Sequence, residues 1–445
     1  MAWKPSPSRR ILGGALLGVG ISSLYRLEPG LASRANNALR MRILATVQSY
    51  FPFQERGGPV FKVRSLGQGL AKRGHEVTVL TADLGILGKN GSGEISFNRC
   101  PWGWCWRENG VETIYLSTIG HYRALTINPS VIRFSRASLK AFDVVHVFGL
   151  YDLLGPVVSH YCRQNVIPYV LEPMGMHRPI VRNVQLKRLY HLMLGSQMTA
   201  GAAFVVATSA QEQQELVDSG ICETRIAVRR NGIDAPGALP TRGEFRKKWS
   251  IDPNAKIILF LGRLVSKKSP DLLVKAFAAW RSRNPQNANS VLVLAGPEQA
   301  DGFGSELRQL VGNLGVSHST FFVGPLFDSD KWEAYRDADV FVLPSQNENF
   351  GNTAAESAAC GTPVIVTDHC GIAPHIGAAG VVIPHDIVDL ERALDRMLKD
   401  SDFLLACQRG CVDMANSLSW EGPLDQTEQL YSRCVSDRLP REVSI

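Results

Sequence analysis

Two glutamates, Glu348 and Glu356, are the residues whose type and setting most strongly suggest chemistry. They flank a turn that follows a predicted buried strand at 340–343 and enters a predicted helix ending near Gly361. In a strand–turn–helix connection the main-chain N–H groups point toward an incoming anion, and a glycine allows close approach. Carboxylates accept hydrogen bonds from hydroxyl groups, as a ribose and a hexose require. The turn itself consists of Asn349, Phe350, Gly351, Asn352 and Thr353.

The same two glutamates also allow a purely structural interpretation. Thr353 and Glu356 have the spacing of a helix capping box, which would place Glu356 on the first helical turn. Glu348 alone fits a solvated loop position. Physical chemistry by itself leaves the catalytic and structural interpretations open.

A basic turn follows the predicted strand at 257–261. Its candidate residues are Gly262, Arg263, Lys267 and Lys268. Two cations at a strand end can stabilise the charge of a departing diphosphate without a metal. Considered without its surroundings, the turn also fits a solvated basic loop.

A glycine pair, Gly57-Gly58, lies between a predicted strand at 42–46 and a predicted helix at 60–73. Such a pair lets main-chain N–H groups approach a phosphate or an acceptor. Alone it also fits a plain turn.

These candidates belong to two series of alternating strands and helices, which predict two mainly parallel sheets with helices on both faces. The chain has 445 residues and 45% hydrophobic content, more than one core usually holds. Predicted strands of the first series are 42–46, 76–81, 111–116, 144–148, 169–172, 204–208 and 226–229, with helices at 60–73 and 210–219. Those of the second are 257–261, 291–295, 320–323, 340–343, 364–367 and 381–383, with helices at 270–281 and 305–312.

The predicted organisation has five parts. Residues 1–40 form an extension, 41–235 an N-terminal domain, 236–248 a linker rich in Pro and Gly, and 249–418 a second domain. Residues 419–445 form a C-terminal segment. The stretch 84–110 reads as a long surface insertion. Ligands of such sheets bind beyond the carboxyl ends of the strands, where the motifs lie.

With its motifs in this order, the chain from Met41 onward resembles family 4 of the retaining glycosyltransferases, which have the GT-B fold. Seven residues separate Glu348 from Glu356, and Gly361-Thr362-Pro363-Val364 follows. The resemblance implies that Glu348 holds the donor sugar and Glu356 the ribose, while Arg263 and Lys268 bind the diphosphate and Lys267 matches less well.

The resemblance also implies that 41–235 is the acceptor-side domain and 249–418 the donor-binding domain. Residues 419–445, which include Trp420 and Tyr431, would form a helix that crosses back to the first domain. The resemblance further implies transfer from a nucleoside diphosphate sugar to an acceptor hydroxyl with retention, without a metal or a further cofactor. The departing phosphate accepts the proton on the same face.

The sequence departs from this family where many members carry a histidine. Met174 takes that position if Gly175 matches the family glycine, and His177 lies two residues beyond Gly175. His177 is therefore a candidate catalytic or sugar-contacting residue, with a structural role as the alternative. His146 is a second candidate, although its position in a strand favours packing.

Charge is unevenly distributed, with 21 basic and 14 acidic residues in 41–235 and 21 against 26 in 236–445. The basic first domain fits an anionic partner, or ordinary surface variation. The basic residues Arg178, Arg182, Lys187 and Arg188 fit contact with a lipid phosphate or with water. We expect a nucleotide sugar and an acceptor glycan or lipid-linked saccharide as partners, peripheral contact with an anionic membrane, and no nucleic acid.

Residues 1–40 allow three interpretations: a twin-arginine export signal, a weak membrane anchor, or a true start at Met41, with a dispensable tail as the variant of the third. We favour the third, because an exported enzyme could not reach cytoplasmic nucleotide sugars. Nine cysteines without repeated pair spacing also fit a reducing cytoplasm. The expected location is the cytoplasm, including the inner face of the membrane.

The acidic pairs Asp328/Asp330 and Asp337/Asp339 invite comparison with a metal site. We interpret the first pair as helix N-caps and the second as flanking a buried strand, so no metal site is predicted. Two other functions remain in play: an epimerase or hydrolase of nucleotide sugars, and a non-catalytic nucleotide-sugar-binding protein.

Overall fold

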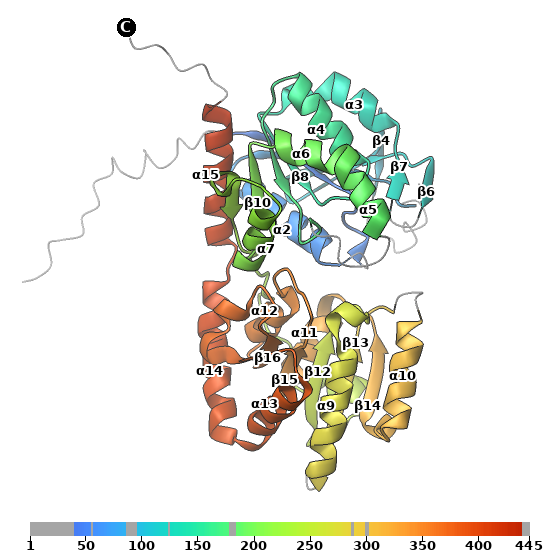
Figure 1. Cartoon of the computed structure of the whole chain (residues 1–445), viewed down its shortest axis with the longest axis vertical. Helices are drawn as coiled ribbons and strands as arrows, with labels where there is room; N and C mark the ends of the chain where they lie inside the picture. Colours follow the sequence, from blue (N-terminus) through green and yellow to red (C-terminus); the bar gives the residue numbers. More distant parts are fainter. Residues whose placement is uncertain are drawn as a thin grey trace, which may run out of the picture. The chain divides into compact units, whose positions relative to one another are not determined.

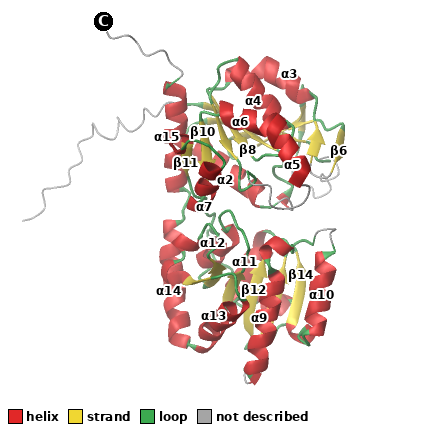
Figure 2. Cartoon of the chain, viewed as in Figure 1, coloured by secondary structure: helices red, strands yellow, loops and turns green. Residues whose placement is uncertain are grey.

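The computed structural model describes residues 40–54, 57–85, 96–122, 125–177, 184–285, 289–298 and 302–437. Within these ranges the chain forms two α/β units, each built on a largely parallel sheet that helices cover (Figure 1, Figure 2). We call the unit of residues 41–235 the first layer, together with α15 (Glu421–Ser436) that packs on it, and the unit that follows the second layer. The predicted pair of doubly wound α/β sheets is therefore confirmed. The expectations for residues 1–39, for Arg178 and Arg182, and for 86–95 of the insertion lie outside the described residues.

The first sheet has nine described strands in the order β11-β10-β9-β8-β1-β2-β5-β4-β3. From β11 to β5 neighbouring strands are parallel, whereas β4 and β3 are antiparallel additions. The strands are β1 (Arg42–Val47), β2 (Glu76–Ala82), β3 (Asn98–Cys100), β4 (Gly103–Glu108), β5 (Val111–Leu116), β8 (Val144–Phe148), β9 (Tyr169–Glu172), β10 (Phe204–Ala207) and β11 (Ile226–Val228); β6 (Gly120–Tyr122) and β7 (Leu125–Ile127) form a separate hairpin.

Helices cover this sheet because successive strand residues point to opposite faces. In β1, Ile43 and Ala45 enter one hydrophobic cluster and Leu44 enters another. The Ile43 cluster includes side chains of α2 and α15, and the Leu44 cluster includes side chains of α3, α4 and α6. The helices are α2 (Gly58–Lys72), α3 (Ser130–Ser138), α4 (Leu154–Gln164), α5 (Val184–Tyr190), the π-helix η4 (His191–Gly195), α6 (Ser196–Gly201), α7 (Ala210–Asp218) and α15 (Glu421–Ser436).

The second sheet is parallel throughout, in the order β14-β13-β12-β15-β16-β17. Its central strands are nearly continuous apolar runs, as expected for strands buried on both faces. The strands are β12 (Lys256–Leu261), β13 (Ser290–Ala295), β14 (Thr320–Gly324), β15 (Val340–Leu343), β16 (Val364–Thr367) and β17 (Gly380–Ile383); the helices are α8 (Glu244–Lys248), α9 (Pro270–Arg283), α10 (Phe303–Asn313), α11 (Asp328–Asp337), α12 (Asn352–Ala359), α13 (Ile387–Lys399) and α14 (Ser401–Ser417). Short 3₁₀ turns, among them η6 (Ser266–Lys268), complete the layer.

The insertion at 84–110 is more ordered than the sequence suggested. Its second half forms β3 and β4, and β4 pairs with β5 along its whole length. Trp104, Trp106 and Phe97 pack against the buried pair Phe53 and Tyr115. The described part of the insertion therefore extends the sheet at its edge, and its residues other than Gly103 are exposed or half-buried.

Two connecting segments take part in packing. Within the predicted linker 236–248, α8 carries Phe245 into a core of the second layer. At the other end of the chain, α15 contacts α2 and β8 of the first layer (Figure 1). Among the described helices, none is both long and apolar enough to span a membrane. The exact domain limits stay a prediction.

Candidate functional site

Glu348 lies in the loop between β15 and α12, where a neighbouring loop fixes its backbone. Its N–H donates to the carbonyl of His369 at 3.0 Å, and its carbonyl accepts from the N–H of Gly371 at 2.9 Å. His369 and Gly371 follow β16, the strand adjacent to β15. The loop is therefore held at the carboxyl edge of the second sheet, where ligands of such sheets bind.

Glu348 and Lys268 form an ion pair. Lys268 ends η6, after β12, and the Gln346 N–H donates to the carbonyl of its neighbour Lys267 at 3.0 Å. The two motifs predicted to bind the donor are thus in contact, although 80 residues separate them. Burial and then the nearby Arg263 guanidinium lower the pKa of Lys268 to about 7.

Arg263 differs from Lys268 because its side chain has no hydrogen-bond or ion-pair partner among the described residues, and the residue is exposed. Lys267 lies close enough for Arg263 to lower its pKa, after the larger effect of burial. Lys187 of α5 is near Lys267 and has its own pKa lowered by burial and by that charge. Arg263, Lys267 and Lys268 therefore lie near one another. Glu348 pairs with Lys268, and Glu215 of the first layer acts on Lys267. The remaining positive charge suits a diphosphate.

Glu356 occupies a different environment from Glu348. Its carboxylate lies 2.9 Å from the Nζ of Lys331 and accepts a 3.0 Å hydrogen bond from the hydroxyl of Tyr335. The helix cap is Gly351, with φ of 113°, and makes no side-chain cap hydrogen bond. Glu356 consequently lies beyond the first turn, and the capping-box interpretation with Thr353 is wrong.

The remaining residues of the turn divide between core and surface. Phe350 is buried in the core of the second layer, so its side chain cannot reach a ligand and only its main chain can contribute. A Cβ on Gly351 would lie 2.8 Å from Ile372, so the positive φ and the close packing both require glycine. Asn349, Asn352 and Thr353 are half-buried beside it.

Loops of the first layer contact this turn at three points. The Nδ2 of Asn231 donates to the Oδ1 of Asn352 at 3.0 Å. A Cβ on Gly58 would lie 3.7 Å from Asn352, and a Cβ on Gly175 would lie 3.0 Å from Asn349. Gly57 caps α2 with φ of 87°. The predicted Gly57-Gly58 loop therefore meets the predicted donor turn, with the amino ends of α2 and α12 close together.

Neither histidine candidate, His177 or His146, contacts Glu348 in the structure. His177 is buried, its ring contacts that of His191 at 4.8 Å, and burial followed by the His191 charge lowers its pKa to about 4. His146 is fully buried, its Nδ1 lies 2.6 Å from the hydroxyl of Tyr431, and burial lowers its pKa to about 4. Met174 and Gly175 both have positive φ, and the Gly175 N–H donates to Glu212 at 2.5 Å. A catalytic role for His177 stays a prediction.

A buried charge cluster in the first layer was missed by the sequence analysis. Glu172 ends β9 and forms ion pairs with Lys62 of α2 and Arg229, while His146 lies 3.4 Å away. Burial raises the pKa of the Glu172 carboxyl, but the Arg229 and Lys62 charges outweigh it, so the pKa lies well below its usual range. These residues carry no shared motif, and only the charged residue types within apolar strands hinted at them.

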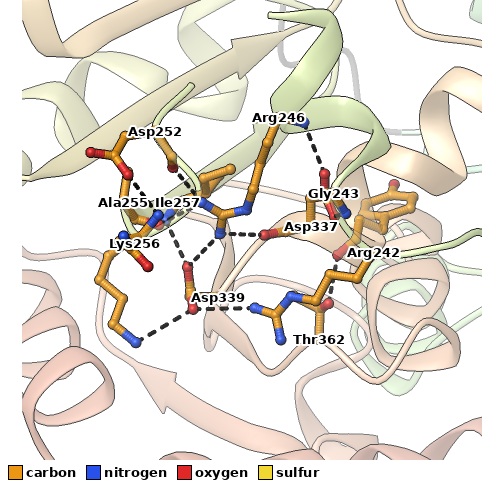
Figure 3. Close-up of polar contacts among 12 residues, drawn as sticks. Arg242, Gly243, Arg246, Asp252, Ala255, Lys256, Ile257, Asp337, Asp339 and Thr362 are labelled. Carbon is orange, nitrogen blue, oxygen red and sulfur yellow. Dashed lines mark hydrogen bonds and ion pairs between the residues drawn. The ribbon is translucent and has the colours of Figure 1, made fainter. Parts of the chain in front are cut away.

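The acidic pair Asp337 and Asp339 has structural partners (Figure 3). Asp337 accepts from the Arg246 N–H at 2.9 Å, and Asp339 accepts from the Ile257 N–H at 2.8 Å and from the Arg246 guanidinium at 3.2 Å. Asp328 and Asp330 are not caps, because α11 begins at Asp328 with Phe327 as its cap residue. They lie in the first helical turn, where acidic side chains favour the helix dipole.

Comparison with known proteins shows the family to which the chain belongs. Residues 241–410 match the family Glycosyl transferases group 1, and residues 57–232 match the Glycosyl transferase 4-like domain. The chain is 33% identical over 327 residues to the D-inositol 3-phosphate glycosyltransferase of Thermomonospora curvata, covering 67% of this chain and 75% of that protein. The chain belongs to the group 1 glycosyl transferases.

Two further relatives and one solved structure are also similar to this chain. The D-inositol 3-phosphate glycosyltransferase of Salinispora tropica is 31% identical over 341 residues, 69% of each chain. That of Corynebacterium jeikeium is 32% identical over 244 residues, so this chain spans 58% of its length. HepE of Anabaena, solved with UDP and glucose, has a TM-score of 0.70 at 16% identity and covers 88% of this chain and 100% of its own. That likeness shows the fold, which is GT-B.

Proposed function

We propose that this glycosyltransferase moves a hexose, with retention, from a nucleoside diphosphate sugar to an acceptor hydroxyl of a lipid-linked glycan in polysaccharide biosynthesis. One observation carries the proposal: exposed, unpaired Arg263 adjoins the Lys268–Glu348 pair at the carboxyl edge of the second sheet. Cations in that position suit the charge that a departing diphosphate develops. HepE, a neighbour in fold, was solved with UDP-glucose, which makes a UDP-sugar the first donor to test.

Each site residue takes a separate part in this reaction. Arg263 and Lys268 bind the diphosphate, and the ammonium of Lys268 has enough N–H donors to contact both Glu348 and a phosphate oxygen. Glu348 accepts hydrogen bonds from the sugar hydroxyls. Glu356 accepts from the ribose, because its two oxygens keep free lone pairs beside Lys331 and Tyr335.

The reaction needs no protein base. The bond between the anomeric carbon and the β-phosphate oxygen breaks, and the acceptor oxygen bonds to the same carbon on the same face. The acceptor proton passes to the departing phosphate oxygen, whose negative charge the Arg263 and Lys268 side chains stabilise. His177 is not required for this route, which accords with its burial against His191.

A phosphorylated cyclitol is the second acceptor candidate. The relatives from Thermomonospora curvata and Salinispora tropica are named for D-inositol 3-phosphate. We place the reaction in the cytoplasm, where nucleotide sugars are available, with the enzyme at the inner face of the membrane.

The test is transfer of labelled sugar from a panel of nucleotide sugars to membranes or to inositol 3-phosphate. We expect label in the acceptor, and Arg263→Ala, Lys268→Ala and Glu348→Ala each to abolish its transfer with unchanged thermal unfolding. Lys275→Ala is the matched control, because Lys275 of α9 lies on the surface in a pair with Asp271. Free sugar or an isomer formed without any acceptor would contradict the proposal and favour a hydrolase or epimerase.

A further inference from the structure

The segment α5–η4 exposes an apolar stripe on the first layer. Four side chains are more than half exposed: Leu186 (57%), Leu189 (51%), Leu192 (75%) and Met193 (59%). Their spacing of three and four residues puts them along one side of a helical segment. Single exposed apolar residues are normal on a protein surface, but a contiguous stripe usually marks an interaction site. We call these four residues the α5–η4 face.

The opposite side of this segment is anchored to the body of the layer. The hydroxyl of Tyr190 donates to the carbonyl of Asp152 at 2.8 Å, and His191 contacts the ring of His177. Lys187 lies over the ring of Tyr151, with its Nζ 5.4 Å from the ring centroid. The apolar stripe therefore belongs to a packed element with a fixed orientation.

The chain segment that carries the α5–η4 face has charges of one sign. Residues 173–211 contain no Asp or Glu, and the described helix α5 contributes Lys187 and exposed Arg188. The nearest carboxyl group from another element is that of Asp152, which is buried beneath Tyr190. Exposed leucines combined with basic side chains and no acidic ones are typical of helices that lie in the head-group region of anionic bilayers. A second protein copy would not require such a one-sided charge.

A groove adjoins the same segment. It has a volume of about 310 Å³. Its lining is mixed: the apolar part includes Ile132, Val157, Leu194 and Met198, and the polar part includes His160, Arg163 and Gln197. Leu194 directly follows Met193 in the chain, so the exposed face continues into a partly apolar recess. The apolar part of this lining suits an acyl chain.

We propose that the α5–η4 face docks on an anionic phospholipid bilayer; this inference rests on the proposed function, because docking would bring the donor site to a lipid-linked acceptor. The same helix supplies the link to the site, since Lys187 is near enough to Lys267 to interact with it electrostatically. The leucines and methionine enter the head-group boundary, and Arg188 contacts lipid phosphates.

Co-sedimentation of the full chain with vesicles tests this proposal. We expect binding to phosphatidylcholine vesicles that contain phosphatidylglycerol, little binding to phosphatidylcholine alone, and weaker binding as salt rises. The affinity of the double variant Leu189→Glu/Leu192→Glu for the anionic vesicles should be lower by a factor of about ten or more. Leu405→Glu is the matched control, because Leu405 of α14 is 53% exposed and lies on the second layer.

Several outcomes would overturn the docking surface. They are absence of wild-type binding to anionic vesicles, equal binding to both vesicle types, and unchanged binding of the double variant. Light scattering adds another: a dimer that dissociates in the double variant while vesicle binding persists would assign the face to a second copy. Donor-dependent transfer to soluble inositol 3-phosphate is measured separately without vesicles, so failure of the proposed function is distinguishable from failure of docking.

Discussion

Glu172 in the first layer and Glu348 in the second make the same kind of contact in opposite surroundings. Each carboxylate pairs with a lysine near the carboxyl edge of its sheet. The Glu172 side chain is fully buried, whereas that of Glu348 is 16% exposed and lies beside an unpaired arginine. A buried pair cannot exchange its partner for a ligand, but a partly exposed one can. The difference in burial therefore assigns a structural role to Glu172 and leaves Glu348 as the candidate catalytic residue.

The second layer also contains a buried charge cluster, and it is satisfied differently from that of Glu172 (Figure 3). The Arg246 guanidinium donates to the carbonyls of Asp252, Ala255 and Asp337 as well as to Asp339. In the first layer, Nε and Nη1 of Arg229 have no hydrogen-bond partner among the described residues. The Glu172 cluster therefore depends on charge pairing, and loss of its one central carboxylate should be costly.

The largest effect is expected for Glu172→Gln. The change leaves Lys62 and Arg229 buried without their counter-charge, which typically costs about 3–5 kcal/mol. Denaturant unfolding should show the loss, with Glu223→Gln on the surface of the same layer as control. A loss below about 1 kcal/mol would remove the distinction between the two glutamates.

Glu348→Gln should impair sugar transfer strongly and stability only slightly, the reverse of Glu172→Gln. We expect kcat/KM for sugar transfer to fall about 100- to 1000-fold, because a group that contacts the reacting sugar is changed, while stability changes by less than about 1 kcal/mol. Steady-state kinetics and denaturant unfolding measure both quantities, and Glu306→Gln on α10 is an exposed control. Loss of stability equal to that of Glu172→Gln would assign Glu348 to structure instead.

The first-layer cluster also predicts a pH dependence of stability. Burial lowers the pKa of His146 to about 4, so below the unfolded value of about 6.5 the unfolded state binds more protons than the folded state. Stability therefore falls as pH drops from 6.5 toward 4. Between pH 7 and 5, wild type should lose about 2 kcal/mol more than His146→Gln. His177 and Asp152 also titrate in this range, but they contribute equally to both proteins, and parallel unfolding curves would contradict the assignment.

The smallest effect is expected for Glu356→Gln. A ribose contact predicts a KM for the nucleotide sugar that is raised about tenfold with a smaller change in kcat, since the sugar itself is not contacted. Loss of the ion pair with Lys331 should reduce stability by only about 1 kcal/mol. Initial rates at varied donor concentration measure the first quantity. An unchanged KM would leave Glu356 with a structural role beside Tyr335.

Much of the fold was predictable because it depends on local pattern. The strands β5, β8, β9, β15 and β16 match the predicted ranges, since apolar runs between turn residues are recognisable without tertiary context. The strands of the insertion were not predicted, because β4 pairs with β5 and packs against aromatic residues that are distant in sequence, such as Phe53. The capping box failed because the helix begins after Gly351, whose positive φ and close packing only glycine accepts.

The sequence by itself determined the two parallel sheets, the order of the motifs and the identity of Glu348, Arg263 and Lys268 as candidates, because periodicity and motif order are properties of the chain. Only the tertiary structure decided which charges meet and which are buried. Lys62, Glu172 and Arg229 are far apart in sequence but share one buried cluster, and α5–η4 exposes leucines that a helical pattern would otherwise assign to a core. Burial sets the cost of an unpaired charge, so the same residue types stabilise the first layer and form a candidate active site in the second.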